Sequence, residues 1–317
     1  MNSFGNSYRK YISHLEQIND AALHCPQRMV HEFEAAYAED LAAAAHTIAS
    51  HREHCRIVML SGPSSSGKTT TSHRLIAVLE KMGIHAVSIS LDDFYRGEGM
   101  APVLPDGSFD YEAVEALDVE RVEDCLRCLM EEKRCEIPRF DFMQHRPAPD
   151  TREITLGEDS IAVVEGIHSL NPIFTRCLPE DQVTKIYVSV KQGIKDANGV
   201  VISPMDLRLI RRIVRDNATR NASAEQTLGM WSTVVSGEDK YIRPYRHTSD
   251  ITINSIHMYE PCVLRVDAIP ILRALSPDSR WFRKARDLEA RLMRFEPLSS
   301  AMVPQESLLR EFIGPKE

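Results

Sequence analysis

Five short apolar runs recur along the middle of the chain, and each is rich in β-branched residues. They cover residues 57–60, 86–91, 161–164, 185–190 and 251–254. None shows a clear alternation of apolar and polar positions, as expected of strands whose two faces are both covered by helices. The segments between them have helical or loop character. This alternation of strands and helices predicts an α/β fold over residues 56–260, with a doubly wound, parallel, five-stranded sheet.

The two ends of the chain have helical character. Residues 1–55 include an alanine-rich run at 33–49, and residues 261–317 are interrupted by Pro270 and Pro277. We expect a helical N-terminal extension over 1–55 and a helical C-terminal extension over 261–317 that packs on the sheet domain. A contact between the subunits of a homo-oligomer is the alternative role for the C-terminal extension.

The first apolar run leads directly into a glycine-rich turn of the form G-x-x-x-x-G-K-[ST]. Gly62 and Gly67 lack a Cβ, so the backbone between them can fold around an anion with its N–H groups pointing inward. Lys68 can then reach the β- and γ-phosphates of a nucleotide, and Thr69 can offer its hydroxyl to Mg²⁺. The predicted phosphate-binding residues are Gly62, Pro63, Ser64, Ser65, Ser66, Gly67, Lys68, Thr69 and Thr70.

An amphipathic helix is predicted after this turn, as the motif requires. Leu75, Val78, Leu79 and Met82 recur at helical spacing, and Gly83 can end the helix as a C-cap. A helix that starts at an anion site also presents the positive end of its dipole to the anion. The strand, turn and helix together predict binding of a nucleoside triphosphate.

Carboxylates follow two of the other predicted strands. Asp92 and Asp93 come after the second apolar run, and Glu165 comes after the third. The carboxyl ends of parallel strands form the ligand-binding edge of such a sheet. Asp92 is therefore a candidate base for an acceptor hydroxyl, and Thr69, Asp92 and Glu165 are candidate magnesium ligands. Asp93 can equally be a solvated acid, and Glu165 could instead cap the next helix.

Four arginines are predicted to share one face of a helix that begins near Asp206. They are Arg208, Arg211, Arg212 and Arg215. Because only Asp206 and Asp216, at the ends of the helix, are acidic on this face, we expect the guanidinium groups to lack i, i+4 carboxylate partners within the helix. Unpaired arginines suit phosphate oxygens, so the helix could close over a nucleotide as a lid. A solvated surface is the alternative.

The composition limits the partners of the protein. The 317 residues carry 38 basic and 46 acidic side chains, and this net charge of −8 argues against a nucleic-acid partner. No apolar stretch is long enough to cross a bilayer, and residues 1–6 contain no signal-peptide core. The seven cysteines do not form a disulfide framework, and Cys125 lies on the apolar face of a predicted helix. We expect a cytoplasmic protein that acts on a small molecule, without a membrane partner.

Several motifs in order give the chain a resemblance to a known family. After the glycine-rich turn come Asp92-Asp93-Phe94-Tyr95, Phe109-Asp110, Ile137-Pro138-Arg139-Phe140-Asp141-Phe142 with His145, Glu165-Gly166-Ile167, and the arginine helix with Arg220 and Gln226. Over residues 56–255 the chain resembles the uridine kinase and phosphoribulokinase family of P-loop kinases. The resemblance implies a P-loop NTPase fold, ATP and Mg²⁺, and phosphorylation of an alcohol. In uridine kinases this alcohol is the 5′-hydroxyl of a pyrimidine nucleoside.

The resemblance also implies roles for single residues. Asp92 corresponds to the family's base, while Lys68 and the four arginines would stabilise the transferred phosphoryl group, and Arg220 would contact the nucleotide. The residues at acceptor positions are Tyr95, Asp110, Phe140, His145, Arg208 and Gln226. Asp110 can accept hydrogen bonds from two ribose hydroxyls, and amide and imidazole groups can read a base.

Two departures from the family pattern leave the acceptor open. Phe140 stands where uridine kinases usually have a tyrosine, and Asn221 replaces a glycine. A kinase for another alcohol, such as a sugar phosphate or a vitamin precursor, would need additional phosphate-binding cations. The candidates for these are Arg96, Arg139 and Arg146. A nucleotide-dependent switch without an acceptor is a further alternative, although it would not need Asp110 and His145.

Overall fold

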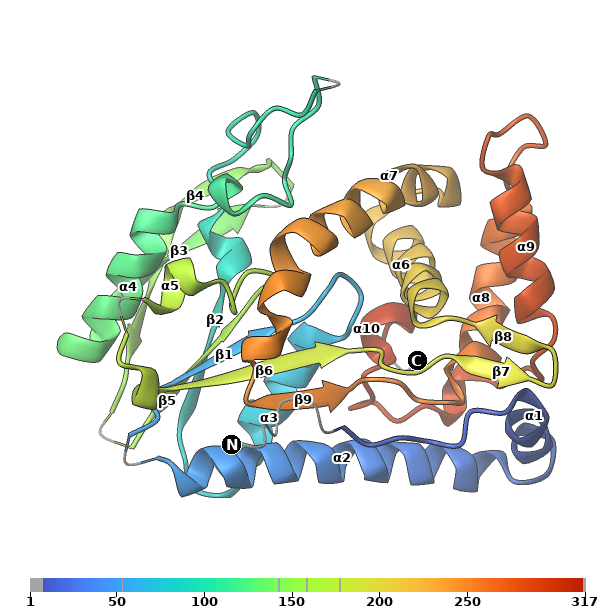
Figure 1. Cartoon of the computed structure of the whole chain (residues 1–317), viewed down its shortest axis with the longest axis horizontal. Coiled ribbons are helices and arrows are strands. Elements are labelled where there is room, and N and C mark those ends of the chain that lie inside the picture. Colours follow the sequence, from blue (N-terminus) through green and yellow to red (C-terminus); the bar gives the residue numbers. More distant parts are fainter. Residues whose placement is uncertain are drawn as a thin grey trace.

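A parallel sheet forms the centre of the protein in the computed structural model, which describes residues 8–315 except 53, 106, 142, 158 and 177. Phe142 of the sequence motif and residues 1–6 thus lie outside the described residues. In spatial order the strands are β2 (Ala86–Ser90), β5 (Ile161–Glu165), β1 (Ile57–Ser61), β6 (Val183–Ser189) and β9 (Ile251–Asn254). All neighbouring strands of this sheet pair in parallel, which confirms the predicted α/β fold (Figure 1).

Helices cover both faces of the sheet, which explains why the strands lack alternation. All five residues of β1 are buried. Ile57 and Met59 belong to one buried cluster, with residues of α4 (Val119–Glu131), and Val58 and Leu60 belong to another, with residues of α3 (Lys68–Lys81). Cys125 packs in the first cluster, as its position on the apolar face of α4 predicts.

The boundaries of two helices near the site follow from the local sequence. α3 begins directly after Gly67, and Gly83 follows its end with a φ of +79°, a conformation that favours glycine. α6 (Pro204–Arg220) begins with a capping box, in which Ser203 and Asp206 each accept a backbone N–H of the other. It ends at Asn221, which adopts the left-handed conformation with a φ of 50°.

The helices of the two chain ends pack on the sheet domain. The N-terminal pair is α1 (Leu15–His24) and α2 (Pro26–Ser50), and the C-terminal set is α8 (Glu260–Arg273), α9 (Phe282–Leu292) and α10 (Arg310–Ile313). α2 packs against α3, and α8 and α10 pack against α6. Residues of both chain ends share one buried cluster with β1 and β6. Within the described ranges, no helix combines the length and the apolar character needed to span a bilayer.

Two antiparallel hairpins add to the predicted elements. They are β3 (Arg134–Asp141) with β4 (Arg146–Thr155), and β7 (Ile194–Asp196) with β8 (Gly199–Ile202). The remaining α-helices of the described residues are α5 (Pro172–Thr175), which is a single turn, and the longer α7 (Ala224–Gly237). The β3–β4 hairpin and α4 lie at one end of the molecule, whereas α8 and α9 lie at the other (Figure 1). The carboxyl edge of the central sheet lies between these two ends.

Candidate active site

The glycine-rich turn between β1 and α3 has no room for a side chain at either glycine. A Cβ on Gly62 would lie 2.2 Å from the carbonyl oxygen of Val188. Gly67 has a φ of +86°, and a Cβ there would lie 2.5 Å from the side chain of Leu308. The geometry therefore requires both glycines of the motif.

The same turn carries polar groups without a protein partner. The hydroxyls of Ser65 and Ser66 are buried and form no hydrogen bond within the described part of the chain. Because buried polar groups are nearly always hydrogen-bonded, two orphaned hydroxyls in one turn indicate a place for a ligand. Lys68 begins α3, and Thr69 is exposed beside it. The turn and the first residues of α3 thus fit a chain of phosphates.

Carboxylates meet beside this turn at the carboxyl edge of the sheet. β5 lies between β1 and β2, and its last residue, Glu165, pairs with Leu60 and Ser90. The Ser90 hydroxyl donates to Glu165 Oε1 at 3.1 Å, and the Thr69 hydroxyl donates to the same oxygen at 3.5 Å. Asp92 follows β2, with its backbone N–H bonded to Ser90 Oγ at 3.3 Å. The strand order therefore brings Thr69, Asp92 and Glu165 to the same edge.

The pKa of Glu165 reflects its burial and the charges that surround it. Burial raises the pKa of the Glu165 carboxyl to about 6, and the nearby Asp92 carboxylate adds to this rise, whereas Lys68 opposes it. One hydroxyl and two carboxylates beside a phosphate site fit Mg²⁺, which binds proteins through one or two carboxylates and takes phosphate oxygens as further ligands. No group of three or more histidine, cysteine or acidic side chains in the described residues is arranged to hold a metal alone. Water and phosphate oxygens would complete the coordination of such an ion.

Two arginines of α6 hold the backbone of the glycine-rich turn. Arg208 donates to a carbonyl of the turn at 2.9 Å and pairs with Glu238 at 2.7 Å. Arg211 is fully buried, donates to the next carbonyl at 3.2 Å and pairs with Glu260 at 2.6 Å. Arg208 and Arg211 thus pair with carboxylates from outside the helix. The expectation that the helix itself supplies no i, i+4 partner is wrong for Arg212, which pairs with Asp216 at 3.2 Å. Arg208 and Arg211 position the turn.

The other arginines of α6 gather around Asp216. Arg212, Arg215 and Arg220 lie 3.2, 2.7 and 3.6 Å from its carboxylate. Arg212 also donates to the hydroxyl of Ser64 in the turn at 2.8 Å. Three guanidinium groups against one carboxylate leave excess positive charge beside the turn, which suits phosphate oxygens. The burial of nine residues of α6 argues against the expected lid movement, because opening would expose them.

A cavity of about 390 Å³ lies next to Asp110, on the side expected for an acceptor. The buried Asp110 carboxylate accepts from the Tyr241 hydroxyl at 2.9 Å and from the backbone N–H of Glu112 at 3.2 Å. The polar side chains around the cavity come from Asp110, Ser232, Thr233, Ser236, Lys240 and Tyr241. Lys240 and Tyr241 belong to a π-helical turn, Glu238–Ile242, and such turns are frequent at functional sites.

The aromatic and histidine residues predicted for the acceptor lie at the β3–β4 hairpin. The rings of Tyr95 and Phe140 are in contact, with centroids 5.8 Å apart, and the Tyr95 hydroxyl donates to the Tyr111 carbonyl at 3.2 Å. His145 is exposed in the hairpin turn, with a φ of 51°. Its carbonyl accepts the backbone N–H of Glu98 at 2.9 Å. The structure therefore brings Tyr95 and Phe140 together and leaves His145 at an exposed rim.

Gln226 lies at the start of α7. Its side-chain oxygen accepts the backbone N–H of Ser223 at 2.8 Å, and its own backbone N–H donates to the Ser223 hydroxyl at 3.2 Å. These two bonds form a capping box. Gln226 is exposed and does not line the cavity at Asp110. The side chain has a clear structural use in capping the helix.

Two titratable residues near Asp110 were not predicted from the sequence. Burial raises the pKa of Glu112 to about 7. His168 is 1% exposed, and neither of its ring nitrogens has a hydrogen-bond partner that the described residues supply. Burial lowers the pKa of the His168 imidazole to about 4, so the ring is neutral near pH 7. The His168 ring lies against Tyr241. His168 comes three residues after Glu165, the last residue of β5, and this position near the carboxyl end of a strand could have marked it as a candidate site residue.

Comparison with known proteins gives consistent results for this region. The model of the Phosphoribulokinase / Uridine kinase family matches residues 57–260. Uridine-cytidine kinase B of Dictyostelium discoideum is 32% identical over 205 residues, which are 64% of this chain and 76% of that protein. A uridine kinase of Macrococcus caseolyticus is 30% identical over 198 residues, which are 62% of this chain and 86% of that protein.

A solved structure shares the fold at lower sequence identity. It is described as a putative fructose transport system kinase from Silicibacter sp. TM1040, and it is 22% identical to this chain. The match has a TM-score of 0.50 and covers 67% of this chain and 98% of that protein. The matched region of the family model contains the glycine-rich turn, the two carboxylates and α6, and it ends at the start of α8.

Proposed function

The chain belongs to the Phosphoribulokinase / Uridine kinase family, and from this premise we propose that it phosphorylates the 5′-hydroxyl of a nucleoside such as uridine or cytidine. It is an ATP-dependent kinase. The acceptor, the metal and the roles of single residues are parts of the proposal. Residues 56–260 are proposed as the kinase domain, with 1–55 and 261–317 as helical extensions.

One observation carries the proposal. A turn with two obligatory glycines and two orphaned buried hydroxyls lies at the same sheet edge as Asp92 and Glu165. Phosphoryl transfer needs such an arrangement, because most of the catalysis comes from positioning and from charge stabilisation around the transferred group. A phosphate-binding turn without a carboxylate beside it would bind a nucleotide but would lack a base for an alcohol.

In the proposed reaction, the acceptor hydroxyl lies between Asp92 and the γ-phosphate. Its oxygen attacks the γ-phosphorus, its proton passes to the Asp92 carboxylate, and the bond to the β-phosphate oxygen breaks to release ADP. Lys68 and Arg212 lie beside the turn and offset negative charge on the phosphates. Arg208 and Arg211 act indirectly by fixing the turn's carbonyls.

Thr69, Asp92 and Glu165 would hold Mg²⁺, which when bound neutralises charge on the phosphate oxygens. The Thr69 hydroxyl already faces Glu165 at 3.5 Å. Glu165 is buried and lies near the Asp92 carboxylate, and Lys68 offsets only part of the cost of its charge. This cost supports a role as a metal ligand over a role as a helix cap.

Two observations favour a nucleoside over a sugar phosphate as the acceptor. Two proteins to which the chain is similar are named uridine-cytidine kinase and uridine kinase, and these names point to nucleosides. The additional cations that a sugar phosphate would need also have carboxylate partners of their own: Arg96 lies 3.5 Å from Asp118, and Arg139 lies 3.0 Å from Asp150. The third candidate, Arg146, is exposed and donates to Gln144.

The experiment that tests the proposal is product analysis. The protein is incubated with Mg-ATP and a panel of nucleosides and sugar phosphates, and the phosphorylated species is identified by mass. We expect ADP and a nucleoside 5′-monophosphate in equal amounts. Release of inorganic phosphate with every acceptor would instead identify a switch, and a phosphorylated sugar phosphate would identify the other kinase class.

A matched pair of variants tests the base. Asp92→Asn should retain ATP binding and should lower the transfer rate by about 10²–10⁴-fold, the usual contribution of a general base. Glu98→Gln removes an exposed carboxylate from the same loop and should leave the rate unchanged. Full activity of Asp92→Asn would remove the proposed base.

A further inference from the structure

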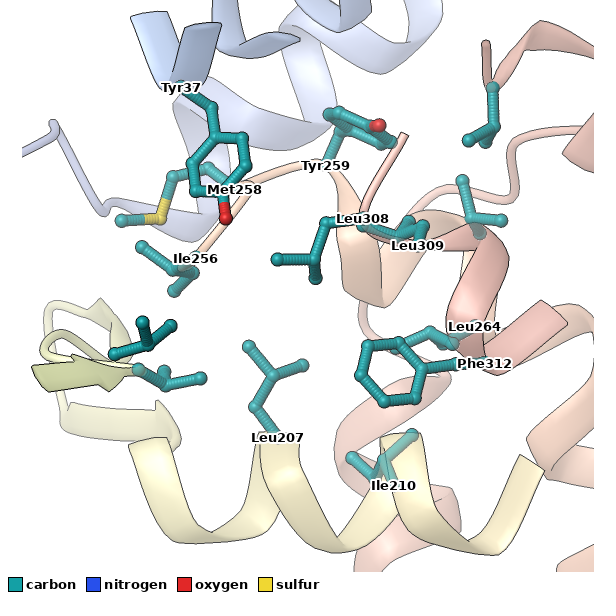
Figure 2. Close-up of a cluster of buried hydrophobic side chains, with 14 of the residues drawn as sticks. Tyr37, Leu207, Ile210, Ile256, Met258, Tyr259, Leu264, Leu308, Leu309 and Phe312 are labelled. Atoms are coloured by element: carbon teal, nitrogen blue, oxygen red, sulfur yellow. The ribbon is translucent and has the colours of Figure 1, made fainter. Parts of the chain in front are cut away.

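A segment near the C-terminus lies directly on the glycine-rich turn. It comprises Ser307–Ile313 and falls outside the residues that match the family model. Leu308 is fully buried, and its side chain fills the space in front of Gly67. Figure 2 shows Leu308 and Phe312 in a cluster with Leu207 of α6 and Tyr37 of α2. The segment is therefore part of the surroundings of the phosphate site.

Within this segment, Glu311 binds the start of α3. Its Oε2 accepts the Thr70 hydroxyl at 2.8 Å and the Thr70 backbone N–H at 3.4 Å. The N–H groups in the first turn of a helix have no partner inside the helix. In this turn they are the donors that a phosphate chain would use, and Thr70 is among the predicted phosphate-binding residues. A carboxylate thus occupies donors that the motif provides for phosphate.

The charge of Glu311 acts on the same groups as the phosphates would. Glu311 adds to the rise in the pKa of the nearby Glu165, and it opposes the effect of burial on the pKa of Arg220. A phosphate and this carboxylate cannot both use the Thr70 donors without strong repulsion, because like charges at hydrogen-bond distance from one group repel at low dielectric. One anion must displace the other.

We propose that Glu311 sets the affinity of the nucleotide site, because its carboxylate occupies the Thr70 donors until a phosphate of the nucleoside triphosphate replaces it. The inference rests on the proposed function. Glu311 is a positioning residue that touches the nucleotide site in the free protein and leaves it in the complex. ATP binding therefore includes the cost of breaking two hydrogen bonds to Thr70.

The rest of the segment can stay docked when Glu311 turns away. The Phe312 ring packs against the Arg211 guanidinium, 4.9 Å from the ring centre. The Ser307 hydroxyl donates to the buried Glu34 of α2, which also accepts the Tyr259 hydroxyl at 2.7 Å. Glu311 itself is only half-buried, so its side chain can rotate towards solvent. Displacement thus requires a change of rotamer and leaves these buried contacts intact.

Direct binding measurements test the inference. The dissociation constants of ATP and of inorganic tripolyphosphate are measured by calorimetry, without an acceptor, for the wild type, Glu311→Gln and Glu311→Ala. We expect both variants to bind both ligands about tenfold more tightly, because the competing charge is gone. Glu311→Gln keeps the size of the side chain and so preserves the packing of the segment. Glu306→Gln, which alters an exposed carboxylate nearby, should bind as the wild type does.

The outcomes separate this inference from the proposed function. Unchanged or weaker binding by both Glu311 variants would overturn the inference. Lower thermal stability of the variants with unchanged affinity would likewise show that Glu311 only caps α3. The variant Lys68→Ala reports on the phosphate site itself. If wild type, Glu311→Gln and Lys68→Ala all bind ATP equally weakly, the proposed function fails, and the inference fails with it.

Discussion

The nucleotide side and the acceptor side of the site are built in different ways. On the nucleotide side, the Arg211–Glu260 pair between α6 and α8 is fully buried, and α6 and the C-terminal segment both reach the glycine-rich turn. On the acceptor side, the Arg139–Asp150 pair is more than half exposed, and His145 lies at the tip of a hairpin. The glycine-rich turn is therefore part of the protein core, whereas two of the residues expected at the acceptor, His145 and Gln226, are exposed.

This difference has a physical consequence for substrate choice. Buried, mutually hydrogen-bonded groups have few alternative arrangements, so they can fix the position of a phosphate chain without reorganisation. Exposed side chains such as His145 can change rotamer, or can be replaced by other residues, at little cost in stability. The family's chemistry is thus expected to be constant while the acceptor varies. Among the residues expected at the acceptor, Asp110 and Arg208 are buried.

The largest effect should come from a matched pair of arginine variants. Arg211→Met leaves the buried Glu260 carboxylate without its cation, which should lower the free energy of unfolding by about 3–5 kcal/mol. Arg139→Ala breaks an exposed pair and should cost about 0–1 kcal/mol. Urea unfolding of both variants measures the difference. Equal losses would contradict the contrast between a buried nucleotide side and an exposed acceptor side.

The next effect concerns the buried carboxylate on the acceptor side. Asp110→Asn should lower kcat/KM for the acceptor about a hundredfold, because hydrogen bonds from hydroxyls to a charged group contribute about 1.5–3 kcal/mol each. The dissociation constant of ATP should not change. Tyr241→Phe, which removes one hydrogen bond to Asp110, should have a smaller effect in the same direction. A change in ATP affinity without a change in acceptor kinetics would show that Asp110 acts on the nucleotide side and not on the acceptor side.

The smallest effect is a pH dependence of stability at Glu165. Its pKa is about 6 in the folded protein, above its ordinary value of 4.5, so the ionised form destabilises the fold above pH 6. Glu165→Gln should therefore be more stable than the wild type by about 2 kcal/mol at pH 8. This advantage should disappear as the pH falls through 6 towards 4.5. Unfolding at several pH values measures it, with Glu98→Gln as an exposed control. If the difference in the free energy of unfolding between Glu165→Gln and the wild type does not vary with pH, burial does not raise the pKa of Glu165.

Local patterns were enough to predict the sheet and the glycine-rich turn. β1, the turn and α3 are consecutive in the chain, and the pattern of their residues directly reflects their burial. Asp92 and Glu165 could be placed at one edge because parallel strands share a carboxyl end. The β3–β4 hairpin could not be predicted in this way, because β4 is exposed along nearly its whole length and carries no apolar alternation.

The partners of the site residues could not be predicted, because they are distant in sequence. Arg208 and Arg211 pair with acids 30 and 49 residues further along the chain, and Thr70 binds a carboxylate 241 residues away. A search for partners within one helix misses all three contacts. For Gln226 the local signal was present, since Ser223 precedes it at the spacing of a capping box. The resemblance gave it an acceptor role, and that role stays a prediction.

A crystal structure with a non-hydrolysable ATP analogue, Mg²⁺ and a nucleoside tests the central claim most directly. The account predicts the triphosphate in the turn at residues 62–69 and the 5′-oxygen of the nucleoside within hydrogen-bond distance of Asp92. A triphosphate bound elsewhere, or a nucleoside whose 5′-oxygen points away from Asp92, would contradict it.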